Sequence, residues 1–317
     1  MPSGQHVSHG ISGLADEGLA RWIAQVRRSN GPPNRAVGAQ RLREAARQRA
    51  ASRPRGPELA QVQDLRTGEG VPLRLYRPSR EPRPLAIFLH GGGFVVGDLD
   101  SADGTCRRLA KTAGVAVLAV DYRRAPEHPA PAAIEDAVNA FTWAGQRLDE
   151  LGGDPASGIA LAGESAGGAI AVLAAIRLRG QPPGASSLLL AYPNADMTLS
   201  QQSAEQEGHG WGLDADDLRW FVEQWIPDPG DRANPDVSPV HSDVSGLPPT
   251  LIATAEHDPL RDEGNMLAGL MRTSGADVTY LPHPGLVHGF LGLAHVSAAA
   301  AHAGEDLFRR FGAVVRR

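Results

Sequence analysis

Short apolar runs recur along the chain between stretches of helical periodicity. The runs cover residues 85–89, 115–120, 159–162, 187–191, 251–255 and 278–281. The clearest helical stretches cover residues 131–151, 166–179 and 262–274, and each is followed by glycine, which commonly ends helices. Continuous apolar strands that alternate with helices are typical of a parallel sheet covered on both faces. The pattern predicts an α/β fold with a mostly parallel central sheet flanked by helices.

The first fifty residues do not fit this alternation. From Gly13 to Ser52 the pattern is helical, with a break at residues 31–33 and a second, arginine-rich helix predicted over 36–51. We therefore expect residues 1–52 to lie outside the sheet. The core then opens with an antiparallel hairpin, whose strands at 60–65 and 71–77 flank a glycine-containing turn.

A second departure covers residues 194–243. This stretch places apolar and aromatic side chains around an acidic helix start at 214–217 and returns through a proline-rich segment. An insertion of this length between two core strands is typical of a cap or lid. We expect its aromatic residues to form the core of that cap rather than to contact a substrate. The core itself then consists of residues 53–193 and 244–317.

Composition excludes several function classes. The net charge of −5 and the isoelectric point near 6.1 provide no broad basic surface, so no nucleic-acid partner is expected. Lys111 is the only lysine, which argues against Schiff-base chemistry. Cys106 is the only cysteine, so neither an internal disulfide nor a multi-thiolate zinc site can form. We expect no metal and no organic cofactor.

The distribution of apolar residues predicts no membrane attachment. Residues 1–10 lack a cationic start followed by an apolar stretch, so no secretory signal is expected. The longest apolar runs, such as residues 169–176, are too short to span a bilayer. We expect a cytoplasmic protein without stable membrane insertion.

The pentapeptide Gly163-Glu164-Ser165-Ala166-Gly167 supplies a candidate nucleophile. By itself the pattern Gly-x-Ser-x-Gly is weak, but here it directly follows a predicted strand and opens a predicted helix, as a nucleophile elbow requires. Glycines on both sides of the serine allow the tight turn. The helix N-terminus behind Ser165 also offers the free backbone N–H of Ala166.

A glycine-rich turn, His90-Gly91-Gly92-Gly93, follows the apolar run 85–89. The N–H groups of Gly92 and Gly93 can join that of Ala166 around a developing oxyanion. A turn of this kind could instead hold a phosphate. That interpretation needs a Gly-x-Gly-x-x-Gly pattern or a Walker lysine, and neither follows Gly93. The turn therefore favours acyl transfer.

An acid and a base follow in the order that an α/β-hydrolase uses. Asp258 comes after the apolar run 251–255 and His288 after the run 278–281, so both lie near the carboxyl ends of predicted strands, where open parallel sheets bind ligands. The same segments hold the alternatives Glu256, Asp262, His257 and His283. Spacing alone does not choose among them.

Together these motifs resemble the hormone-sensitive lipase family of esterases, also called bacterial family IV carboxylesterases. The matching segments are residues 90–98, 121–129, 163–168, 258–263 and 288–290. The sequence departs from the usual family pattern at Glu164, Arg124 and His257, and none of these departures removes a catalytic group.

The resemblance implies a triad of Ser165, Asp258 and His288, and an oxyanion hole from the N–H groups of Gly92, Gly93 and Ala166. It also implies a cap formed by the N-terminal helices and the insertion. The expected activity is hydrolysis of a small-molecule ester with a short to medium acyl chain. An amide, lactone or thioester substrate stays open, as does a homo-oligomer. A non-hydrolytic receptor on the same fold would typically lack the histidine that stands here at position 288.

The segment 121–129 is expected to be structural. Its charged residues would tie together the loops around the glycine-rich turn, and Glu127 is not expected to be catalytic.

Overall fold

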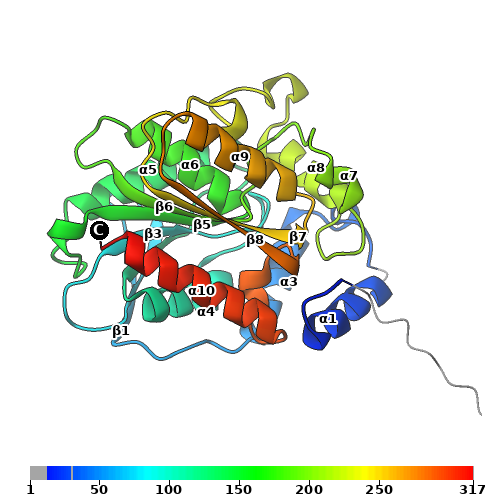
Figure 1. Ribbon diagram of the computed structural model, residues 1–317, viewed down its shortest axis with the longest axis horizontal. Coiled ribbons are helices and arrows are strands. Elements are labelled where there is room, and N and C mark those ends of the chain that lie inside the picture. Colours follow the sequence, from blue (N-terminus) through cyan, green and yellow to red (C-terminus); the bar gives the residue numbers. More distant parts are fainter. Residues whose placement is uncertain (1–12, 30, 317) are drawn as a thin grey trace, which may run out of the picture.

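Eight strands form one sheet with helices on both faces (Figure 1). This computed structural model describes residues 13–29 and 31–316. The strands, in chain order, are β1 (Gln61–Arg66), β2 (Pro72–Arg77), β3 (Leu85–Leu89), β4 (Ala116–Val120), β5 (Ile159–Glu164), β6 (Ala185–Ala191), β7 (Thr250–His257) and β8 (Val278–Val287). Their order across the sheet is β1-β2-β4-β3-β5-β6-β7-β8. The pairs β1–β2 and β2–β4 are antiparallel and all others are parallel, which confirms the predicted fold.

The sheet divides the hydrophobic core into two layers. One face is covered by α5 (Ala132–Gly145), α6 (Ala166–Leu178) and α9 (Arg261–Thr273), and the other by α4 (Leu99–Ala113) and α10 (Ala298–Val314) (Figure 1). Strand β3 shows why its apolar run is continuous. Leu85, Ile87 and Leu89 enter the first layer, whereas Ala86 and Phe88 enter the second.

The sequence located the strand centres but not every element end. Strand β8 continues through Pro282 and Pro284 to Val287, beyond the predicted end at Leu281. Because β8 pairs only with β7, its outer edge tolerates residues without an N–H. The helix predicted over 131–151 is too long, since α5 ends at Gly145 and turns follow.

Three helices precede the sheet: α1 (Glu17–Arg28), α2 (Asn34–Val37) and α3 (Ala39–Ala51). The single helix predicted over 36–51 is wrong at its start, because Gly38 takes a φ of 82° and separates α2 from α3. Leu19 and Ile23 of α1 are fully buried in the core layer of α4 and α10. Helix α3 lies beside α4.

The chain between β6 and β7 carries α7 (Ser203–Gln206) and α8 (Ala215–Trp225). As expected, the α8 aromatics Trp220, Phe221 and Trp225 are buried. Trp225 stacks on Phe94 with ring centroids 3.8 Å apart, and its carbonyl accepts a hydrogen bond from the Ala130 N–H. Helix α8 is therefore packed against the glycine-rich turn that follows β3.

Helix α4 contains the only cysteine and the only lysine of the sequence. Cys106 is fully buried, and burial raises the pKa of its thiol well above the usual value, so it is unreactive. Lys111 is exposed in the last turn of the helix. No helix in the described part of the chain is both long and apolar enough to cross a membrane. Residues 1–10, which bear on the expected absence of a signal, lie outside the described residues.

Candidate active site

Ser165 lies in the sharp turn between β5 and α6. Its φ of 52° and ψ of −123° are unusual for a residue other than glycine and cost about 1–3 kcal/mol. The flanking glycines are required sterically. A Cβ at Gly163 would lie 2.2 Å from the Gly167 oxygen, and one at Gly167 would lie 2.0 Å from the Leu89 oxygen. The turn therefore presents Ser165 at the carboxyl end of the sheet.

Ser165, His288 and Asp258 form a continuous hydrogen-bonded chain. His288 Nε2 lies 2.9 Å from Ser165 Oγ, and His288 Nδ1 lies 2.8 Å from Asp258 Oδ2. Asp258 is fully buried, and its other carboxylate oxygen accepts the Leu260 N–H at 2.8 Å. A neutral imidazole that donates from Nδ1 to the carboxylate has its Nε2 lone pair directed at the serine hydroxyl. This arrangement can remove the serine proton.

The four alternative acids and bases have other partners. Glu256 accepts the Gly285 N–H at 2.7 Å, and Asp262 accepts the Ser203 N–H and pairs with Arg261. The ring of His257 stacks on Trp211 with centroids 4.0 Å apart, and that of His283 packs against Phe290. Among the described residues, none of the four is hydrogen-bonded to Ser165 or His288.

The glycine-rich turn lies beside the serine. A Cβ at Gly91 would be 3.3 Å from that of Ser165. The turn is closed by the N–H groups of Val95 and Val96, which both donate to the Gly92 carbonyl. Gly92 and Gly93 have φ values of 126° and 58°. Within residues 13–29 and 31–316, the N–H groups of Gly92, Gly93 and Ala166 have no acceptor, so three donors stay available next to Ser165.

Two aromatic side chains contact this site. Tyr192 was not among the predicted residues, and Phe221 is an aromatic residue of the insertion 194–243, which was expected to form the core of the cap. The rings of Tyr192 and His288 form an edge-to-face contact with centroids 4.9 Å apart, and the Tyr192 hydroxyl donates to Glu164 Oε2 at 2.7 Å. Burial and the adjacent Glu164 carboxylate raise the pKa of the Tyr192 hydroxyl, which stays protonated. Phe221 covers Gly93. Tyr192 directly follows β6. A position just after the carboxyl end of a strand was the criterion that selected Asp258 and His288, and it would also have selected Tyr192.

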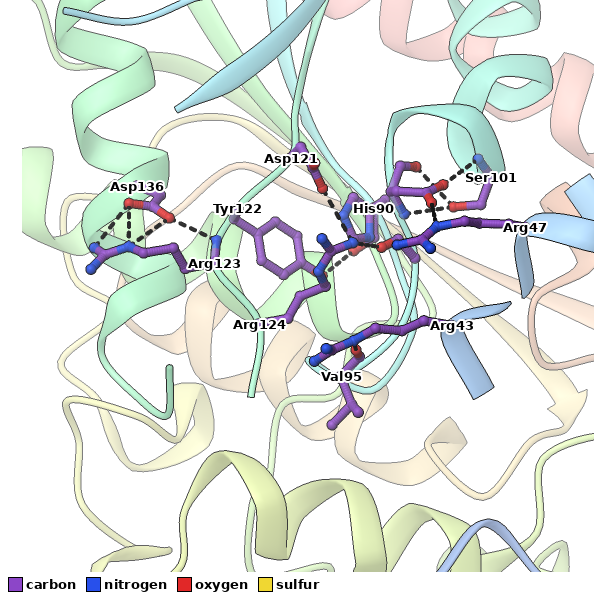
Figure 2. Close-up of polar contacts among 12 residues, drawn as sticks. Arg43, Arg47, His90, Val95, Ser101, Asp121, Tyr122, Arg123, Arg124 and Asp136 are labelled. Atoms are coloured by element: carbon purple, nitrogen blue, oxygen red, sulfur yellow. Dashed lines mark hydrogen bonds and ion pairs between the residues drawn. The ribbon is translucent and has the colours of Figure 1, made fainter. Parts of the chain in front are cut away.

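His90, at the start of the turn, is a structural residue. It is 2 % exposed and stacks on Tyr122 with centroids 4.3 Å apart (Figure 2). Its Nδ1 lies 2.8 Å from the Gly91 carbonyl oxygen. Its carbonyl accepts the Tyr122 hydroxyl proton at 2.8 Å. Burial lowers the pKa of His90 to about 4, so the ring is neutral near pH 7.

The charged residues of segment 121–129 connect the loops around this turn, as expected. Arg123 holds Asp136 of α5 with nitrogen–oxygen distances of 2.9 and 3.0 Å, and Arg124 donates to the Gly97 carbonyl (Figure 2). Glu127 forms a bidentate ion pair with Arg43 of α3. Glu127 forms no hydrogen bond or ion pair with Ser165, Asp258 or His288.

The chain is similar to known esterases. Residues 86–292 match the family described as alpha/beta hydrolase fold. Carboxylic ester hydrolase LipN of Mycobacterium tuberculosis is 40 % identical over 257 residues, 78 % of this chain and 68 % of the relative. Ethyl acetate hydrolase of Pseudomonas putida is 40 % identical over 233 residues, which are 71 % of this chain and 73 % of the relative.

Solved structures extend the similarity to nearly the whole chain. A hyperthermophilic esterase from Pyrobaculum calidifontis superposes with a TM-score of 0.85 at 33 % identity, covering 96 % of this chain and 98 % of that one. All six predicted site residues fall within the family match at residues 86–292.

Proposed function

The chain belongs to the hormone-sensitive lipase family of α/β-hydrolases, and from this premise we propose that it is a serine carboxylesterase that uses Ser165, His288 and Asp258. The family resemblance inferred from the sequence motifs is confirmed. The observation that carries the proposal is the hydrogen-bonded chain from Ser165 Oγ through His288 to a fully buried Asp258.

Acylation begins when Ser165 Oγ attacks the ester carbonyl carbon. As the new C–O bond forms, the serine proton moves to His288 Nε2 and the carbonyl π electrons move to the carbonyl oxygen. Asp258 stabilises the imidazolium. The unpaired N–H groups of Gly92, Gly93 and Ala166 would donate to the oxyanion, and such donors are most effective where water is excluded.

Collapse of this intermediate breaks the bond to the alcohol, which takes the proton from His288 Nε2. The acyl group stays on Ser165. Water then attacks the acyl carbon while His288 accepts a water proton, and the second collapse returns that proton to Ser165 Oγ and releases the carboxylic acid. The three side chains and water account for every proton transferred and every bond formed or broken, so the mechanism uses no metal or organic cofactor.

We propose short to medium acyl esters as substrates. The name of the Pseudomonas relative specifies ethyl acetate, an ester of a two-carbon acid. In this chain the Phe221 ring packs directly on Gly93 and leaves little room on that side of the oxyanion turn. The hydrogen bond between His288 and Ser165 also favours an enzyme that hydrolyses its substrate over a receptor that binds a ligand without hydrolysis.

Residues 1–52 and 194–243 are proposed to form one cap over a core of residues 53–193 and 244–317. Three contacts join the two cap segments. The Asn34 N–H donates to Asp217 at 2.9 Å, and Arg27 Nε donates to the Gly210 carbonyl at 2.9 Å. An ion pair of 2.6 Å also links Arg35 to Glu223. These contacts support packing of the two segments against each other.

The proposal is tested by Ser165→Ala, assayed on p-nitrophenyl esters from acetate to palmitate. Loss of the hydroxyl should lower kcat/KM by about a thousandfold or more. The surface variant Ser29→Ala serves as control and should keep wild-type turnover. Near-native turnover by Ser165→Ala would exclude the mechanism, whereas a wild-type maximum at palmitate would exclude the short-chain substrate class.

A further inference from the structure

Arg43 of α3 binds two segments that surround the glycine-rich turn. Its Nε donates to the Val95 carbonyl at 2.8 Å (Figure 2). Its Nη2 donates to the Ala125 carbonyl at 2.7 Å. Both Nη atoms also donate to the Glu127 carboxylate, at 2.8 and 2.6 Å. The side chain is only 16 % exposed. Four of the five guanidinium N–H bonds are therefore used.

The turn needs external support to keep one conformation. Gly92, Gly93 and Phe94 have consecutive positive φ values of 126°, 58° and 65°. Glycine populates many backbone conformations, and the positive φ of Phe94 costs about 1–3 kcal/mol. Such a backbone persists only where its neighbours hold it. The Ala125 N–H already donates to the Phe94 carbonyl at 3.0 Å, and Arg43 joins the same two segments through Val95 and Ala125.

We propose that Arg43 is a positioning residue for the oxyanion hole. By fixing the Val95 and Ala125 carbonyls, its guanidinium sets the direction of the N–H groups of Gly92 and Gly93. This inference rests on the proposed function. It also gives the N-terminal segment a positioning role, because correct docking of α3 becomes a condition for a working oxyanion hole.

The geometry requires arginine. A planar guanidinium can hold two carbonyls and a carboxylate in fixed directions, whereas a lysine ammonium would act as a point charge without this fork. The hydrogen bonds from Arg43 lower the pKa of Glu127 to about 2, so the ion pair persists throughout the neutral and mildly acidic range. Burial of Arg43 also limits competition from water.

The test compares Arg43→Met with Arg35→Met. Arg35 lies in the same N-terminal segment and pairs with Glu223, but it does not contact the oxyanion turn. Both variants are assayed on p-nitrophenyl acetate and on its thiono analogue, in which sulfur replaces the carbonyl oxygen. Sulfur is larger and accepts hydrogen bonds poorly, so the thiono ester gains little from the oxyanion hole.

In Arg43→Met, the ratio of kcat/KM for the oxo ester to that for the thiono ester should fall about tenfold or more, mainly through kcat of the oxo ester. Arg35→Met should keep the wild-type ratio. Addition of ethylguanidinium to Arg43→Ala should restore part of the ratio. A parallel loss on both esters would mean that Arg43 only stabilises the fold and would overturn the proposal.

If circular dichroism shows that Arg43→Met does not fold, Arg43→Lys replaces it. This variant keeps the positive charge but loses the planar fork that holds the Val95 and Ala125 carbonyls, and an unchanged ratio would likewise overturn the inference. Ser165→Ala separates the two proposals. Oxo ester turnover that survives Ser165→Ala refutes the proposed function, whereas an inactive Ser165→Ala with an unchanged ratio in Arg43→Met refutes only the role of Arg43.

Discussion

At the scale of single residues, Phe221 makes Gly93 intolerant of substitution. A Cβ on Gly93 would lie 2.3 to 2.7 Å from three atoms of the Phe221 ring, on a backbone with a φ of 58°. In Gly93→Ala, the ring and the turn would have to separate, which would turn the Gly93 N–H away from the oxyanion. We expect kcat on p-nitrophenyl acetate to fall by about 10- to 100-fold, with a smaller change in KM.

Two further variants locate the cause of that loss. Gly68→Ala serves as control and should keep full activity, because nothing lies within 4 Å of the added methyl group. Gly93→Ala combined with Phe221→Ala should regain part of the lost kcat, since the colliding ring is gone. Wild-type kcat in Gly93→Ala alone would contradict the steric explanation.

Residues with a local signature can be singled out from the sequence, whereas residues whose partners are distant in the chain cannot. Ser165 stands in a recognisable pentapeptide, and Asp258 and His288 each follow a strand. Arg43, by contrast, belongs to an arginine-rich helix that carries no motif. Its partners are 52 to 84 residues away in the chain, and no periodicity connects such distant positions.

At the scale of elements, one carboxylate connects the starts of two helices. Asp16 caps α1 by accepting the Leu19 N–H at 2.8 Å, and its second oxygen accepts from Ser297 Oγ and the Ala299 N–H, both at 2.8 Å. Ser297 is itself the N-cap of α10. Although burial opposes ionisation, these hydrogen bonds keep the pKa of Asp16 below its usual value.

Asp16→Ala should therefore lower the free energy of unfolding by about 1–2 kcal/mol, the usual cost of a lost N-cap, with an additional loss from the bonds to α10. Urea unfolding followed by circular dichroism measures the change. Asp16→Asn keeps an oxygen that can cap α1 and should lose less. Equal stability of Asp16→Ala and the wild type would show that this connection contributes nothing.

Element boundaries were less predictable than element identities. Prolines and glycines within 282–285 normally mark a turn, yet β8 runs through them because its outer edge needs no hydrogen bonds. Conversely, Gly38 interrupts a stretch whose composition favours one helix. For β8 the position at the sheet edge decided the outcome, and a local pattern carries no information about it. At Gly38 the glycine itself is the local signal of the break.

At the scale of the whole molecule, His90 should make stability depend on pH. Its pKa is about 4 in the folded protein, compared with 6.5 for an ordinary histidine. Above pH 6.5 the ring is neutral in both the folded and the unfolded protein, and its contribution to the free energy of unfolding is complete. As the pH falls from 6.5 to 4, the unfolded chain binds a proton that the folded protein does not, so stability falls by about 3 kcal/mol.

The His90→Asn variant isolates this contribution. Its free energy of unfolding, measured by urea titration between pH 7 and pH 4, should lie below that of the wild type at pH 7. The difference should narrow as the pH approaches 4, because asparagine does not titrate. Parallel curves for the two proteins over this range would rule out His90 as the responsible group.

The position of Lys111 has a practical consequence for handling the enzyme. Helix α4 starts just after the glycine-rich turn at the carboxyl end of β3 and runs back along the sheet, so its last turn lies at the opposite end from Ser165. Lys111 is exposed there and is the only lysine side chain. Coupling to an amine-reactive support through this side chain would orient the immobilised enzyme with its active site facing the solution.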